Sequence, residues 1–309
     1  MDDATIAAAA RLLGVELTAD ERALLPERLE TQLADAKRRR GLHFANAEPP
    51  ASRFDPRPAG FVAPEWSGAA FEVPGPSPLP ESESEIAFAP VASQAAWLRG
   101  GALSARRLTE IYLERIDRLA GRLEGFVTPT PELARAQAAA ADAELTAGRW
   151  RGSLHGIPYA AKDLFDSAGV ATTWGADHLV DRTPEQDAAV IARLAAAGAV
   201  LLGKATLGAL AYGDVWHGGQ TRNPWNPEEG SSGSSAGSAA AVVAGLAGFA
   251  IGSETLGSIV TPCLRCGATG LRPTYGRVSR HGAMALAWSL DKIGPICRHA
   301  IDTGWCCRP

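Results

Sequence analysis

Two serine-rich loops and one lysine are the residues of this chain that are best suited to nucleophilic chemistry. The loops span residues 230–238 and 252–259. Lys162 has apolar neighbours, which disfavour its ammonium form and lower its pKa, so that a neutral amine becomes available as a base. Serine hydroxyls beside such a base are typical of covalent catalysis. Taken alone, Lys162 better fits a lysine that snorkels to solvent or pairs with Asp163 or Asp166.

The first serine loop allows several interpretations. A flexible Gly/Ser linker is one, but the loop continues directly into an alanine-rich helix that Ser238 is able to cap, as an oxyanion site at a helix start requires. A phosphate-binding loop is excluded because the Gly-Lys-Ser/Thr ending is missing. The window 233–237 also fits a Gly-x-Ser-x-Gly nucleophile elbow, with Ser235 as an alternative nucleophile, although a loop rather than a strand precedes it.

Taken together, the motifs resemble the amidase signature family. The matching segments follow in the family's order: residues 154–158 with Lys162-Asp163, then 233–238, 252–259, 266–279 and 289–295. The resemblance covers about residues 91–298. It implies an α/β fold in which a mixed β-sheet is flanked by helices, and it implies hydrolysis of a carboxamide through an acyl-enzyme, without a cofactor or a metal.

The resemblance also implies roles for individual residues. It implies a Ser–cis-Ser–Lys triad in which Lys162 is the base, Ser234 the bridging serine and Ser258 the nucleophile. Gly233 and Ser235 would support the bridging serine. The oxyanion would be held by the backbone N–H groups of Thr255, Leu256, Gly257 and Ser258.

The chain departs from the family pattern near these residues. Glycine is usual in the family where this chain has Ser232, Ala236 and Leu256, and arginine is frequent at the position of Val260. A Leu256 with positive φ would carry strain of about 1–3 kcal/mol. Alternatively, the backbone tolerates the leucine, which then narrows the pocket.

The end of the chain departs further. Family members continue well beyond this length, and residues 301–309 show neither helical nor strand periodicity. We therefore expect an incomplete core, and a truncated fragment without activity is one alternative function. The glutaminase subunit of a tRNA-dependent amidotransferase is another. It is disfavoured by the N-terminal region and by the missing acidic residue in segment 207–210.

The elements that must position these residues begin at about residue 91, where helical and strand patterns alternate. Before it, residues 1–90 form an N-terminal helical accessory region with a proline-rich linker over 47–85, and 301–309 form a tail outside the 91–300 core. Ser104 and Thr18 are expected helix caps. The predicted helices are 4–13, 19–39, one after Ser104, 131–148 and 184–198; the predicted strands are 157–163, 199–203 and 249–251.

Charge and cysteine content indicate which partners and which cellular location to expect for the protein. The 30 basic and 34 acidic side chains of this 309-residue chain give a net charge of −4 without a basic stripe, which argues against nucleic acid and membrane surfaces. Lys37 to Arg40 suit the C-terminal turn of a helix. Cys263-x-x-Cys266 lacks the second pair that a zinc site needs, which favours structural thiols and a cytoplasmic location. The expected partner is a small-molecule amide, and a homodimer stays open.

Overall fold

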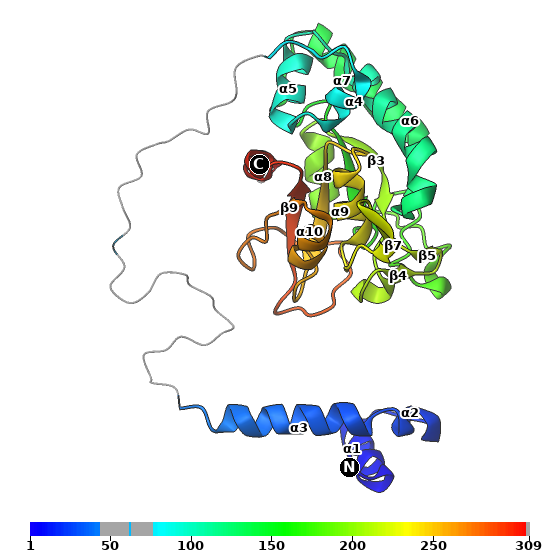
Figure 1. The fold of residues 1–309 in the computed structure, drawn as a ribbon. Coiled ribbons are helices and arrows are strands. Elements are labelled where there is room, and N and C mark those ends of the chain that lie inside the picture. Colours follow the sequence, from blue (N-terminus) through cyan, green and yellow to red (C-terminus); the bar gives the residue numbers. More distant parts are fainter. Residues whose placement is uncertain (44–61, 63–76, 307–309) are drawn as a thin grey trace. The chain divides into compact units, whose positions relative to one another are not determined.

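A computed structural model describes residues 1–43, 62 and 77–306 of the chain (Figure 1). The chain divides into two compact units, Met1–Ala59 and Gly60–Pro309. The proline-rich segment 47–85 that the sequence predicts as a linker lies mostly outside the described residues, and its last three residues belong to a helix of the second unit.

Residues 1–43, the described part of the N-terminal unit, form three helices, α1 (Asp3–Leu13), α2 (Ala19–Ala23) and α3 (Pro26–Arg40). Thr18 caps α2 in a capping box with Glu21, as its sequence position predicts. The prediction of one helix over 19–39 is wrong, because Pro26 cannot continue a preceding helix and instead begins a new one. The four basic residues lie in the last turn of α3.

The second unit is built on a six-stranded mixed sheet in the order β1-β3-β2-β8-β10-β9. Strand β2 pairs parallel with β3 and with β8, and the other pairs are antiparallel. The mixed sheet predicted from the family resemblance is therefore confirmed. The strands are β1 (Phe126–Pro129), β2 (Pro158–Lys162), β3 (Val200–Ala205), β8 (Phe249–Glu254), β9 (Thr269–Gly270) and β10 (Lys292–Cys297).

Helices flank this sheet (Figure 1). Helix α6, capped by Ser104 as predicted, buries Leu108, Ile111 and Ile116 at helical spacing. The helices of this unit are α4 (Glu83–Phe88), α5 (Val91–Arg99), α6 (Ala105–Leu123), α7 (Pro131–Thr146), α8 (Ala189–Ala196), α9 (Ala236–Val243), α10 (Val260–Cys266) and α11 (Ala300–Cys306). Two short hairpins, β4 (Val215–Trp216) with β5 (Gly219–Gln220) and β6 (Arg222–Asn223) with β7 (Asn226–Gly230), lie between β3 and α9 in the sequence.

Two predicted helix starts are wrong, because contacts with other segments decide where these helices begin. Helix α8 begins at Ala189 and not at Pro184, because residues 184–188 bond to the preceding loop, where Gly169 N donates to Pro184 O and Ala188 N donates to Asp166 O. Helix α9 begins before Ser238, so this serine lies inside the helix and donates to Ile251 O instead of capping it.

The segment after Arg298 also differs from expectation. Residues 300–306 form α11, although their sequence shows no helical periodicity. The Asp302 carboxylate accepts hydrogen bonds from Val91 N and Ala92 N at the start of α5, and Trp305 is buried. These contacts with α5 give the segment a defined place in the core.

None of the helices in the described part of the chain combines the length and the apolar character that crossing a membrane requires.

Candidate active site

The candidate base lies at the end of the central strand β2. Because β2 and β8 are parallel, their carboxyl ends reach the same edge of the sheet, which brings Lys162 beside the residues that follow Ile251. The Lys162 side chain is fully buried. Its Nζ lies 2.8 Å from Ser234 Oγ, 3.0 Å from Ser253 Oγ and 3.3 Å from Ser253 O.

The surroundings of Lys162 suit a base. Burial lowers its pKa from 10.5 to about 7, and the negative charges of Asp291 and Glu254 act in the opposite direction. A lysine with this pKa is a neutral amine in a large fraction of molecules at neutral pH, which an ordinary lysine is not.

The loop before α9 presents Ser234 to this lysine. The Gly233–Ser234 peptide bond is cis, and the Ser234 side chain is buried. The carbonyl of Gly233 accepts a hydrogen bond from Thr261 Oγ1 at 2.8 Å, so α10 holds the loop from the other side. Ser234, which is predicted to be the bridging serine, therefore lies within hydrogen-bonding distance of Lys162.

Ser235 has a supporting place and not an exposed one. It is fully buried, its Oγ donates to Ser253 O at 3.1 Å and accepts from Ser253 N at 3.2 Å, and its backbone N donates to Ser258 O at 3.0 Å. These bonds tie the two serine loops together. A nucleophile elbow would present this hydroxyl to substrate, so the geometry disfavours the alternative with Ser235 as nucleophile.

Ser258 follows the loop that leaves β8. Its side chain keeps 8% exposure and lines the same cavity as Ser234 and Ser253. Glu254 shapes this loop, because its carboxylate accepts hydrogen bonds from Ile259 N at 2.8 Å and Val260 N at 3.0 Å. Burial acts to raise the pKa of Glu254, but these backbone donors together with Gly257 and Arg272 lower it overall.

The departures from the family pattern have distinct structural outcomes. Leu256 lies outside the left-handed region and its side chain is 89% exposed, so it neither carries the expected strain nor lines the cavity. Gly257 takes the positive φ, at 88°. The strained position is Ser232, with a φ of 61°, whose backbone N donates to Asp214 Oδ2 at 2.8 Å.

The cavity beside the serines has a volume of about 280 Å³. Its apolar wall comes from the strand–loop segment after β2, the 3₁₀ turn Ala209–Ala211, and the segment before β10. Arg280 and His281 add polar groups to the same wall. The lining apolar side chains are Leu164, Ala211, Ala283, Met284, Ala285, Leu286, Trp288 and Ile293.

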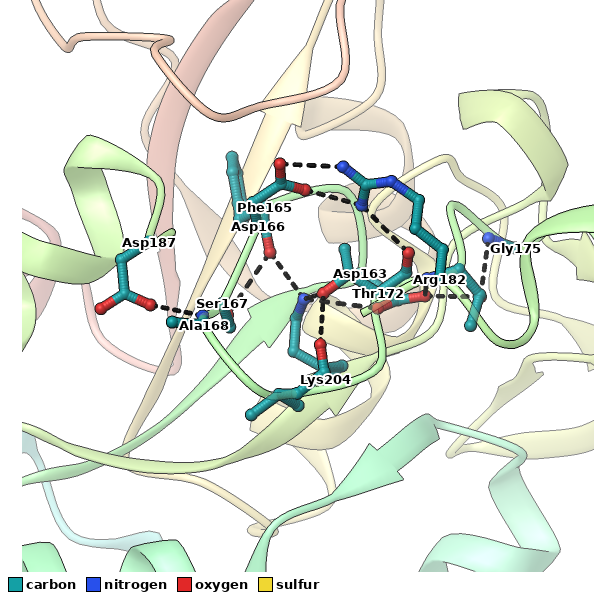
Figure 2. Close-up of polar contacts among 12 residues, drawn as sticks. Asp163, Phe165, Asp166, Ser167, Ala168, Thr172, Gly175, Arg182, Asp187 and Lys204 are labelled. Carbon is teal, nitrogen blue, oxygen red and sulfur yellow. Dashed lines mark hydrogen bonds and ion pairs between the residues drawn. The ribbon is translucent and has the colours of Figure 1, made fainter. Parts of the chain in front are cut away.

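A second buried lysine lies on the adjacent strand, beneath the loop that follows β2 (Figure 2). Lys204 Nζ is 3.4 Å from Asp163 Oδ1 and donates to Phe165 O at 2.6 Å and to Thr172 Oγ1 at 2.7 Å. Asp163 Oδ2 accepts from Thr173 N and Oγ1 at 2.9 and 2.7 Å. Burial lowers the pKa of Lys204 to about 8, and Asp163 opposes that shift. Thus Asp163 pairs with Lys204 and not with Lys162.

Three residues of the site have no distinct signal in the sequence. Ser253 and Glu254 lie within one matching motif and Asp291 lies in another, but the sequence assigns none of them a role. Ser253 binds Lys162 directly, and Asp291 lines the cavity. The sequence marks Ser253 only as a residue near the end of a strand, which does not single it out.

The described cysteines and acidic groups form no metal site. Within residues 1–43, 62 and 77–306, no cluster of three His, Cys, Asp or Glu side chains could hold an ion. Cys263 and Cys266 are buried thiols, and burial raises the pKa of each to about 12. Thiols with such pKa values are poor nucleophiles at neutral pH, which agrees with a structural role.

Comparison with known proteins shows that the chain is similar to the Amidase family. The profile of the Amidase family matches residues 107–308. The chain is 48% identical over 215 residues to a glutamyl-tRNA(Gln) amidotransferase subunit of Halorhodospira halophila, covering 69% of this chain and 44% of that protein. It is 42% identical over 206 residues to the putative amidase AmiD of Mycobacterium tuberculosis, covering 66% of this chain and 43% of that protein.

A solved structure shows the same similarity. The native peptide amidase of Stenotrophomonas maltophilia matches with a TM-score of 0.68 and 40% identity, over 72% of this chain and 48% of that chain. The chain thus spans less than half the length of these relatives.

Proposed function

The chain belongs to the amidase signature family, and from this premise we propose that it hydrolyses the C–N bond of a carboxamide through a serine acyl-enzyme. One observation carries the proposal. A fully buried lysine with a pKa of about 7 lies 2.8 Å from Ser234, and Ser234 lines the same cavity as Ser258.

In the proposed reaction, Ser258 Oγ attacks the amide carbonyl carbon while its proton passes to Ser234, whose own proton passes to neutral Lys162. The tetrahedral intermediate then loses the amine, which takes the proton back through the same relay, and an ester to Ser258 remains. Water repeats the attack on this ester, releases the carboxylic acid and restores the Ser258 hydroxyl. The proton that Ser258 loses leaves with the amine, and the attacking water supplies the proton that restores the Ser258 hydroxyl, so the cycle closes without a cofactor.

The oxyanion of each intermediate would bind at the loop that carries the nucleophile. We propose the backbone N–H groups of Thr255, Leu256, Gly257 and Ser258 as its donors, with Gly233 and Ser235 holding the neighbouring loop. The bond from Ser235 N to Ser258 O supports this arrangement, because it fixes the distance between the two loops. A single donor of this kind contributes about 3–4 kcal/mol to transition-state stabilisation.

The proposed substrate is a small or aryl carboxamide, and a carbamate or ester would follow the same course. The largely apolar cavity wall supports an apolar acyl group. The buried thiols Cys263 and Cys266 support the cytoplasmic location that composition predicts.

Labelling with a fluorophosphonate, which phosphonylates activated serines, tests the proposal. We expect one adduct per wild-type chain and none in Ser258→Ala. Ser84→Ala is the matched control, because Ser84 is exposed on α4, and it should label as the wild type does. Folded wild-type protein that takes no label, or Ser258→Ala protein that still takes it, would refute the proposal.

The similarity to the amidotransferase of Halorhodospira halophila favours one second candidate, a glutaminase. Ammonia release from glutamine compared with release from benzamide separates the two functions. We expect the larger rate with the aryl amide, because segment 207–210 lacks the acidic residue expected there in the glutaminase subunit.

A further inference from the structure

Asp291 is a buried carboxylate that the proposed reaction does not use. It precedes β10, keeps only 8% exposure and lines the cavity that contains Ser234 and Ser258. A carboxylate so placed costs free energy unless its oxygens are satisfied or its charge is balanced. Its partners therefore indicate what it does.

The first set of partners lies in the nucleophile loop. Asp291 Oδ1 accepts a hydrogen bond from Thr255 Oγ1, and the next residue, Lys292, donates from Nζ to Thr255 O at 3.0 Å. The antiparallel register of β8 and β10, which pairs Lys292 with Glu254, brings both groups to Thr255. Thr255 is thus held through its side chain and its carbonyl, where the loop proposed to bind the oxyanion begins.

The second set lies in the cavity wall. Leu286 N donates to Asp291 Oδ2 at 2.8 Å, and Ala287 N donates to both carboxylate oxygens at 3.1 Å. One carboxylate therefore joins the nucleophile loop to the wall segment that contains Leu286.

The charge of Asp291 also acts on the base. Lys162 is influenced by two anions, Asp291 before β10 and Glu254 at the end of β8, and both favour its ammonium form against the effect of burial. Glu254 is itself committed to backbone donors and to Arg272 at 3.3 Å. Arg280 and His281 line the same cavity, and Lys292 lies beside Asp291.

We infer that Asp291 is a positioning residue of the proposed amidase: its carboxylate fastens the oxyanion-binding loop to the cavity wall. The inference rests on the proposed function for its catalytic part. Its electrostatic part, that the charge of Asp291 acts on the titration of Lys162, is measurable without turnover. Asp291 forms no hydrogen bond with Ser258 or Lys162 in the structure. Its effect on the reaction is therefore indirect, through the position of Thr255 and the charge state of Lys162.

The chain has few lysines, so the effect of Asp291 on the titration of Lys162 can be measured directly by NMR. The chain has four, Lys37, Lys162, Lys204 and Lys292. Lysine labelled with ¹³C at Cε therefore gives four NMR signals, and the signal absent from Lys162→Met is that of Lys162. Its titration midpoint in the wild type should lie at about pH 7.

Two variants separate the charge from the hydrogen bonds. Asp291→Asn removes the anion that favours the ammonium form, so the Lys162 midpoint should fall by about half to one pH unit. Thr255→Val keeps the anion and removes one hydrogen bond, so the midpoint should stay while fluorophosphonate labelling of Ser258 slows about tenfold. Asp163→Asn is the matched control, because that buried carboxylate pairs with Lys204 and should leave the Lys162 midpoint unchanged.

Several outcomes would overturn the inference. An unchanged Lys162 midpoint in folded Asp291→Asn removes the electrostatic role. If Asp291→Asn does not fold, Asp291→Glu and Thr255→Val decide the positioning role, and labelling of both at the wild-type rate contradicts it. Failure of the wild type to label at Ser258 instead refutes the proposed function, and the Lys162 titration still tests the electrostatic part.

Discussion

Lys162 is held by hydroxyl and carbonyl groups, and within the described residues it has no carboxylate at ion-pair distance. This explains why burial can lower its pKa so far. A neighbouring carboxylate would hold the proton on the amine, as Asp163 tends to do for Lys204. The two buried lysines therefore differ in their direct partners.

The backbone at Gly233 leads to a prediction at the residue scale. A Cβ at this position would lie 1.8 Å from the carbonyl oxygen of Gly213, so Gly233→Ala must displace the loop that carries Ser234. We expect Ser258 labelling to slow about 100-fold, because a displacement of about 1 Å can cost this much.

Gly121→Ala is the control for this substitution. Its Cβ would meet open space on α6, so labelling should equal that of the wild type. Equal labelling rates for the two alanine variants would show that the position of the Ser234 loop does not matter.

The sequence predicted Lys162, Ser234 and Ser258 as base, bridging serine and nucleophile because each lies in a long motif in the family's order. It did not identify Ser253 or Asp291, because a serine at a strand end and an aspartate before a strand are common and have no special spacing. Their roles depend on the register of β8 with β10 and on side-chain partners far apart in the chain. Roles of that kind require the fold.

At the scale of elements, the three adjacent strands β3, β2 and β8 place both buried lysines. Ala161 lies opposite Lys204 on one side and opposite Ile251 on the other. Lys204 then binds the loop that follows β2 through Phe165 O and Asp163. Because Leu164 of this loop lines the cavity, the buried pair also supports the cavity wall.

This arrangement predicts the stability of a variant. Lys204→Met leaves the Asp163 carboxylate buried without its ion pair, so we expect the free energy of unfolding in urea to fall by about 3–5 kcal/mol. Combining it with Asp163→Asn should cost less than the sum of the two single changes, since the two residues are coupled.

The exposed pair of Arg135 with Glu110 supplies the comparison. Arg135→Met should leave the free energy of unfolding almost unchanged, because solvent screens such pairs. An equally small effect of Lys204→Met would mean that the buried pair contributes little to the fold.

Helices and strands with strong periodicity were predicted close to their observed bounds, as for α1 and β2, and α6 starts after Ser104 as predicted. The break at Pro26 is a local error, whereas the errors at α8 and α11 arose where contacts with other segments decide. Residues 184–188 bond to the loop before them, and α11 owes its place to Asp302 at the start of α5. Neither contact leaves a periodic pattern in the sequence.

At the scale of the whole molecule, all residues of the candidate site belong to the unit Gly60–Pro309. This unit contains the stretch that the Amidase profile matches, and it corresponds to less than half the length of the relatives. The structure nevertheless brings Ser234 and Ser258 to one cavity, and Lys162 lies within hydrogen-bonding distance of Ser234. We propose that these three residues act together on an acyl carbon as bridging serine, nucleophile and base.

The pH dependence of fluorophosphonate labelling at Ser258, followed by peptide mass spectrometry, tests this claim most directly. Labelling needs neutral Lys162, whose pKa is about 7, so the rate should rise through roughly pH 6 to 8 and level off above. In Lys162→Met the rate should be strongly reduced and lose this rise. An adduct on Ser235, or a wild-type rate that does not change across this range, would contradict the account.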